Sequence, residues 1–99
     1  MAEAACVAVA PHGHNSTTVG LAASIQVVAS IPNFLIMEYP IGWEPIANDI
    51  ARNPFKVEKG YIPLPTAPGI GVELDEAALA KYPYTGVRRR ELLGPQDEK

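Results

Sequence analysis

Two short apolar runs stand out in the pattern of hydrophobic and polar positions, and each ends in polar residues. The first run, residues 6–10, contains only Cys, Val and Ala, which is typical of a strand buried on both faces. A loop that carries His12 and His14 follows it. The second run, residues 34–37, ends at Glu38. The pattern therefore predicts two strands whose carboxyl ends carry ionisable side chains.

The segment between the two runs has the spacing of an amphipathic helix. Its apolar positions form one stripe with flanking small residues, namely Leu21, Ala22, Ile25, Val28 and Ala29. Asn15 or Ser16 can cap the start of this helix, which is expected to run to about Ser30 before Pro32 stops it. Strand, helix and strand together predict a βαβ unit with two neighbouring parallel strands.

Neighbouring parallel strands bring their carboxyl ends to one rim of a sheet, where α/β proteins bind ligands and carry out catalysis. His12 or His14 would then meet Glu38 at that rim. Imidazole titrates near neutral pH, which suits proton transfer to or from a substrate. A loop histidine is more often a turn residue than a base, and two histidines with one glutamate are weak evidence for a metal site. Their combination at one rim favours an acid–base site.

The rest of the chain predicts shorter elements. A short helix is expected over residues 46–53, and a hairpin is expected around the turn formed by Lys59 and Gly60. Asp75 is expected to cap a last helix over residues 76–81, and residues 1–5 resemble the last turn of a helix. Two strands make a poor free-standing parallel sheet, so the pattern predicts an α/β fragment that starts within a domain.

Composition and charge restrict the classes of function. Of the 99 residues, 47% are hydrophobic and the formal net charge is -3, which argues against a nucleic-acid partner or an anionic membrane surface. The basic run at residues 88–90 lies beside Glu91 and is expected to be solvated. Cys6, the one cysteine, is expected to be a buried thiol in a reducing compartment. Without a signal peptide or a membrane-length apolar run, the expected location is the cytoplasm.

Six short motifs occur in an order that is more specific than any one of them. They are Ala10-Pro-His12, Ala22-Ala-Ser-Ile-Gln26, Ile31-Pro-Asn33, Met37-Glu38-Tyr39, Gly60-Tyr-Ile-Pro63 and Pro68-Gly-Ile-Gly-Val-Glu-Leu74. Together they resemble the carboxyl-terminal portion of the enolase superfamily, in its mandelate racemase and muconate-lactonizing branch. The resemblance covers about residues 1–82. It is nearest to the acid-sugar dehydratases, such as galactonate dehydratase.

The resemblance implies a fold for each part of the chain. Residues 1–54 look like the carboxyl-terminal part of a modified (β/α) TIM-type barrel, with the two predicted strands as its seventh and eighth. Residues 55–84 look like the return segment that packs on an amino-terminal capping domain, and residues 85–99 form a polar tail. The implied fold is thus the end of a larger barrel.

The resemblance also implies a chemistry. In such enzymes Mg²⁺ holds the substrate carboxylate while a base removes the proton on the neighbouring carbon. His12 best matches the histidine at the end of the seventh strand, which serves as base or as the acid that helps a β-hydroxyl leave. His14 is the alternative match, because this chain has one residue more between His12 and the helix than the galactonate-dehydratase pattern has. Glu38 matches the eighth-strand glutamate that hydrogen-bonds the substrate carboxylate or enolate.

Several groups that the resemblance implies are missing from the chain. The metal carboxylates of the third to fifth strands, the acid–base residues of the second and the capping domain have no counterpart in it. The sequence therefore predicts a piece of a magnesium-dependent acid-sugar dehydratase, a lyase, or of a related racemase or cycloisomerase, and this piece is inactive alone. Its partners would be a sugar acid and the missing barrel portion or a second copy. The alternative is a non-catalytic interaction module, or a piece of a split barrel, that uses exposed apolar faces such as the Leu21, Ile25 and Val28 stripe.

Overall fold

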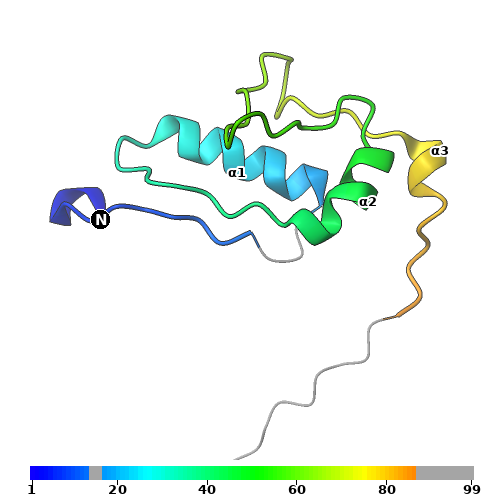
Figure 1. The fold of residues 1–99 in the computed structure, drawn as a ribbon, viewed down its shortest axis with the longest axis horizontal. Coiled ribbons are helices and arrows are strands. Elements are labelled where there is room, and N and C mark those ends of the chain that lie inside the picture. Colours follow the sequence, from blue (N-terminus) through cyan, green and yellow to red (C-terminus); the bar gives the residue numbers. More distant parts are fainter. Residues whose placement is uncertain (14–16, 87–99) are drawn as a thin grey trace, which may run out of the picture.

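The structure is a computed structural model that describes residues 1–13 and 17–86. Its helical elements follow one another as η1 (Glu3–Ala5), α1 (Thr18–Ser30), η2 (Ile41–Trp43), α2 (Glu44–Asp49) and α3 (Glu76–Leu79), where η marks a 3-10 helix. Helix α1 lies between two extended pairs of segments (Figure 1). Within the described ranges no segment forms a full strand, and β pairing is confined to isolated bridges.

One of these bridges joins the two apolar runs, and it is parallel. Val9 pairs with Phe34: the Val9 N–H donates to the Asn33 carbonyl at 2.8 Å, and the Leu35 N–H donates to the Val9 carbonyl at 3.0 Å. The Asn33 side chain adds a bond to the Val7 carbonyl at 2.8 Å. The two runs therefore lie side by side in the same direction along one face of α1 (Figure 1), although only this bridge represents the two predicted strands.

Helix α1 is built as its hydrophobic stripe predicts. Leu21, Ala22, Ile25 and Val28 are buried, whereas Ala29, expected beside the stripe, is exposed. The residue before the helix is Thr17, whose side chain makes no capping bond, and the predicted caps at positions 15 and 16 lie outside the described residues. The helix ends where the chain becomes extended, directly ahead of a proline.

The second pair of extended segments crosses α1 on its other side. Ala51 and Leu74 form an antiparallel bridge, flanked by bonds from the Arg52 N–H to the Glu73 carbonyl and from the Asp75 N–H to the Ile50 carbonyl, both 2.9 Å long. Ile50 and Ala51 are buried and complete the small core that α1 begins. This pairing holds residues 72–75 against the end of α2.

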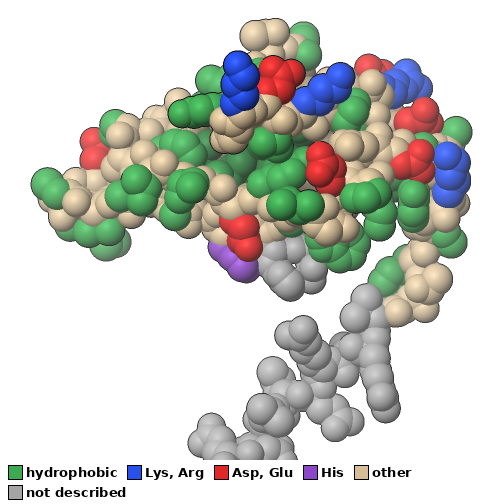
Figure 2. All heavy atoms as spheres, viewed as in Figure 1, with side chains coloured by type: hydrophobic (Ala, Val, Ile, Leu, Met, Phe, Trp, Pro, Cys, Tyr) green, Lys and Arg blue, Asp and Glu red, His purple; other side chains and the backbone are tan. Residues whose placement is uncertain are grey.

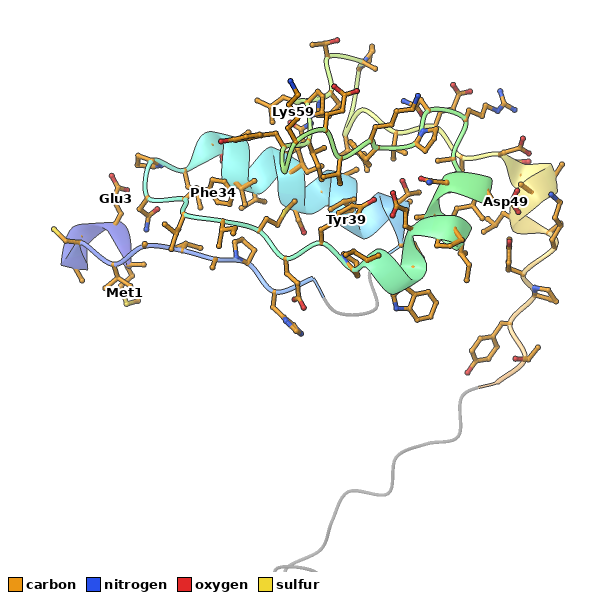
Figure 3. All side chains as sticks on the ribbon, viewed as in Figure 1. Met1, Glu3, Phe34, Tyr39, Asp49 and Lys59 are labelled. Carbon is orange, nitrogen blue, oxygen red and sulfur yellow. The ribbon has the colours of Figure 1, made fainter. Side chains whose placement is uncertain are left out.

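The predicted hairpin turn is present. Glu58 and Tyr61 exchange both backbone bonds, at 2.8 and 3.0 Å, around Lys59 and Gly60, which both adopt positive φ values of 52° and 83°. Two such residues in succession form the turn that matches the twist of a hairpin. Figure 3 places Lys59 on the side of α1 away from Phe34 and Tyr39.

The two short helices near the carboxyl end differ in length from the predictions. Helix α2 begins at Glu44 and ends at Asp49, earlier at both ends than the predicted residues 46–53. Helix α3 ends at Leu79 instead of near residue 81. Its predicted cap is confirmed, because an Asp75 carboxylate oxygen accepts bonds from the N–H groups of Ala77 and Ala78, each at 3.0 Å.

The burial expected for the first apolar run is wrong. Cys6 is exposed and adopts a φ of 54° at the end of η1, so its thiol is not part of a core. Val7 is also exposed, as are Leu35 and Ile36 in the second run. The physical reason is that, among the described elements, the two runs have only α1 and each other as neighbours, so side chains on the uncovered face and along the open edges stay exposed. Hydrophobic side chains consequently show on the surface in Figure 2.

Two further sequence predictions concern membrane-spanning helices and the carboxyl-terminal residues. No helix in the described ranges combines the length and the apolarity needed to cross a membrane. The basic run at residues 88–90 and the polar tail beyond residue 86 lie outside the described residues.

Candidate active site

The two ionisable side chains predicted at the shared rim meet in the structure. His12 Nδ1 lies 2.7 Å from Glu38 Oε2, directly beyond the point where the two runs are paired. The Glu38 N–H also bonds the Pro11 carbonyl at 3.4 Å, which continues the parallel contact toward the rim. Figure 2 shows the histidine beside an acidic side chain at the edge of the visible face. The parallel arrangement therefore delivers an imidazole and a carboxylate to one place.

A backbone group of the same loop joins this pair. The Gly13 N–H donates to Glu38 Oε2 at 2.8 Å, so one carboxylate oxygen accepts bonds from two consecutive residues. Gly13 was not among the site residues predicted from the sequence. A glycine between two histidines, directly after a predicted strand, is the signal that could have pointed to a close backbone approach.

The contact with Glu38 determines which nitrogen of His12 carries a proton. An ionised carboxylate can only accept hydrogen bonds, so Nδ1 must donate, and in the neutral ring Nε2 is then the acceptor. A histidine held in this way can take up a proton at Nε2 and later return it. The side chains of His12 and Glu38 are 74% and 51% exposed, so their contact contributes little to stability and is available for chemistry.

The described residues form only a shallow hollow beside the pair. Its volume is about 10 Å³, which is space for a single water molecule at most. It is lined by His12, Gly13, Leu21, Ser24, Met37, Glu38 and Pro40. A sugar acid needs a larger enclosure, so most of a substrate pocket would have to come from elsewhere. His14, the rival of His12, lies outside the described residues.

The chain beyond Glu38 is tied to the start of α2. Partial burial raises the pKa of the Tyr39 hydroxyl above its usual value of 10.0, and the neighbouring charge of Glu44 and a hydrogen bond to its carboxylate add to this effect. Tyr39 therefore stays a neutral hydrogen-bond donor, and Figure 3 shows it near the end of the segment that leads to α2.

The residues described here do not form a metal site. Among them, no group of three or more His, Cys, Asp or Glu side chains is close enough to hold an ion. His12 and Glu38 bond each other, and the described part of the chain brings no third His, Cys, Asp or Glu side chain to them. The donor set for the magnesium that the resemblance implies is thus not assembled from this part of the chain.

Comparison with known proteins places the chain in a family. The family described as "Enolase C-terminal domain-like" matches residues 1–78. The chain belongs to this family. It is the carboxyl-terminal portion of an enolase-superfamily barrel, as the ordered motifs predict.

Relatives of this enolase-family chain include sugar-acid dehydratases. A D-galactonate dehydratase family member from Streptomyces bingchenggensis is 40% identical over 85 residues, which are 85% of this chain and 20% of the relative. A D-xylonate dehydratase from Haloferax volcanii is 35% identical over 77 residues, or 74% of this chain and 18% of the relative. The chain thus spans about a fifth of the length of these relatives.

A solved structure has the same fold over the matched region. It is described as a mandelate racemase/muconate lactonizing enzyme from Burkholderia SAR-1, and the superposition has a TM-score of 0.77 at 40% identity. The match covers 88% of this chain and 22% of that chain. The local arrangement of α1 and the paired runs therefore belongs to an architecture that is completed by many more residues.

Proposed function

We propose that this chain supplies the carboxyl-terminal acid–base residues of an acid-sugar dehydratase that acts on an aldonate. The observation that carries the proposal is the 2.7 Å contact between His12 Nδ1 and Glu38 Oε2 at the shared end of two parallel segments. The proposal is supported by one relative that is described as a D-xylonate dehydratase and by another that is described as a member of the D-galactonate dehydratase family.

Dehydration of an aldonate removes a proton from the carbon next to the carboxylate and a hydroxide from the following carbon. The electron pair of the broken C–H bond forms a C=C bond as the C–O bond breaks, and the hydroxyl leaves as water once it is protonated. Nε2 of His12 is suited to either proton transfer: as a neutral acceptor it removes the proton, and as an imidazolium it protonates the leaving hydroxyl. Glu38 orients the ring by accepting a hydrogen bond from Nδ1.

The remaining machinery is proposed to lie outside the described residues. Carboxylates that could hold magnesium would come from other strands of the barrel, in the same polypeptide or in a partner. Positioning of the substrate supplies much of the rate of such a reaction, and His12 with Glu38 alone cannot position it. We therefore expect the 99-residue chain alone to bind Mg²⁺ weakly and to turn over no sugar acid.

A chimeric enzyme tests the proposal. In the D-xylonate dehydratase from Haloferax volcanii, the matched 77 residues are replaced by those of this chain, and release of the keto acid from D-xylonate and D-galactonate is measured. We expect dehydration of at least one acid. His12→Asn should lower kcat at least about 100-fold, because it removes the acid–base group. Glu38→Gln should lower it about 10- to 100-fold, because it removes only the group that orients the histidine.

The exposed Lys56 provides the control, since Lys56→Gln should leave the chimera as active as its parent. A folded chimera without activity on any aldonate would contradict the proposal, and so would full activity in His12→Asn. Dehydration by the isolated chain would contradict the expectation that it needs the rest of the barrel.

One observation favours the second candidate, a non-catalytic interaction module. Leu35 and Ile36 remain 69% and 64% exposed, which is unusual for neighbouring large apolar residues. The stripe on α1 that was expected to serve this role is buried, so it cannot be the contact surface. In such a module the exposed pair would matter for function, and His12 and Glu38 would not.

A further inference from the structure

We propose that Gly13 is a positioning residue that fixes Glu38, and through it His12, by its backbone N–H and by the absence of a side chain. The geometric part of this inference stands on the described contacts alone. Its consequence for catalysis rests on the proposed dehydratase function.

One oxygen of Glu38 is an acceptor that His12 and Gly13 share. Glu38 Oε2 receives the Gly13 N–H at 2.8 Å and His12 Nδ1 at 2.7 Å. A carboxylate that is 51% exposed has room for several rotamers, and hydrogen-bond donors at fixed positions restrict them. A backbone donor is attached to the loop and cannot rotate away. The Gly13 N–H therefore gives the carboxylate a fixed reference point.

The backbones of Gly13 and Glu38 also lie close together. A Cβ added to Gly13 would lie 3.0 Å from the carbonyl oxygen of Glu38, which is closer than ordinary contacts of a Cβ atom. The obstructing atom is backbone and not the end of a flexible side chain. The peptide on the other side of Glu38 is held by the bond from the Glu38 N–H to the Pro11 carbonyl, at 3.4 Å. A methyl group would thus push the loop outward and lengthen the 2.8 Å bond.

Backbone strain is not the reason why alanine is disfavoured at position 13. Gly13 does not have a positive φ, so alanine is disfavoured there by space and not by conformation. Gly42 in η2 is a matched control, because a Cβ there meets nothing within 4 Å and its φ is not positive either. Both alanine variants lose the same backbone freedom in the unfolded chain. Only Gly13→Ala should disturb the site.

Nuclear magnetic resonance of the ¹⁵N-labelled 99-residue chain tests the geometric part. The amide proton of Gly13 should shift as Glu38 gains or loses its proton, and this response should vanish in Glu38→Gln. The His12 ring should carry its proton on Nδ1, and Gly13→Ala should move it toward the Nε2 form while Gly42→Ala does not. A Gly13 amide that ignores Glu38, or alanine variants with the same ring signals, would overturn the inference.

The chimeric enzyme tests the catalytic part. Gly13→Ala should lower kcat about tenfold with little change in KM, whereas Gly42→Ala should match the parent. Circular dichroism verifies that both variants keep their helices. Equal kcat values for the two variants would overturn the catalytic role of Gly13. An inactive parent chimera would instead overturn the dehydratase proposal, while the magnetic-resonance result decides the geometry separately.

Discussion

Individual side chains do different work at the two ends of this molecule. His12 and Glu38 are exposed and close, so their contact adds little stability, and we propose that it serves to hold a ring nitrogen for proton transfer. Asp75 is also at the surface, but it satisfies two N–H groups at the start of α3 that would otherwise lack partners. Residue types and their positions in the sequence were enough to predict an acid–base pair at His12 and Glu38 and a helix cap at Asp75.

The cap makes a prediction about pH. The bond from the Ala78 N–H is the largest cause that lowers the pKa of Asp75 below its usual 3.8, and the Ala77 N–H adds to it. Because the pKa in the folded chain is the lower one, this stabilisation is complete above about pH 3.8 and is lost as the pH falls through the folded pKa.

Thermal melting of Asp75→Asn, followed by circular dichroism between neutral and strongly acidic pH, measures this effect. Asparagine keeps an acceptor for the cap but does not titrate, so its melting temperature should fall less steeply below about pH 4 than that of the parent. Asp75→Ala should melt at a lower temperature than the parent at neutral pH. Parallel pH profiles for the parent and Asp75→Asn would contradict the prediction.

Helices were easier to predict here than strands, for a physical reason. The stripe of Leu21, Ile25 and Val28 is a local pattern, and α1 buries it against segments that are all present. A parallel strand needs neighbours on both edges and cover on both faces, and the described residues provide one neighbour and one face. The runs therefore keep the predicted direction through the bridge at Val9 without becoming full strands. The same shortage explains why Cys6 is exposed.

The core under α1 gives the second prediction. Ile25 is 2% exposed, whereas Val27 on the same helix is 57% exposed. Ile25→Ala should lower the free energy of unfolding by about 2–5 kcal/mol, because it removes buried methyl groups and leaves a cavity. Val27→Ala should change it by no more than about 0.5 kcal/mol. Urea denaturation followed by circular dichroism measures both. Equal losses would show that the stripe is not the core of the folded chain.

At the scale of the whole molecule, the described residues match part of an enolase-family domain. Helix α1 lies between the paired runs and the crossing segments (Figure 1). In the second run, the large apolar side chains of Leu35 and Ile36 stay exposed. The chain corresponds to about a fifth of the length of its relatives, and we therefore propose that the remainder of a barrel covers these side chains. The sequence could predict the rim and its two side chains because the two runs carry them. A substrate enclosure could not be predicted, because the described residues form only the hollow of about 10 Å³ beside the pair.

Association with a complementary barrel part tests this arrangement directly. The Haloferax volcanii D-xylonate dehydratase, shortened by its matched segment, is co-expressed with this chain, and complex formation is measured by size-exclusion chromatography. Leu35→Ser with Ile36→Ser should abolish the complex, because it places hydroxyl groups on the apolar face that must be buried. His12→Asn with Glu38→Gln should form the complex but leave it without dehydratase activity. If the serine variant still assembles, the apolar face is not the contact surface. If the histidine variant assembles and stays active, the chain serves as an interaction module and the barrel obtains its acid–base group elsewhere.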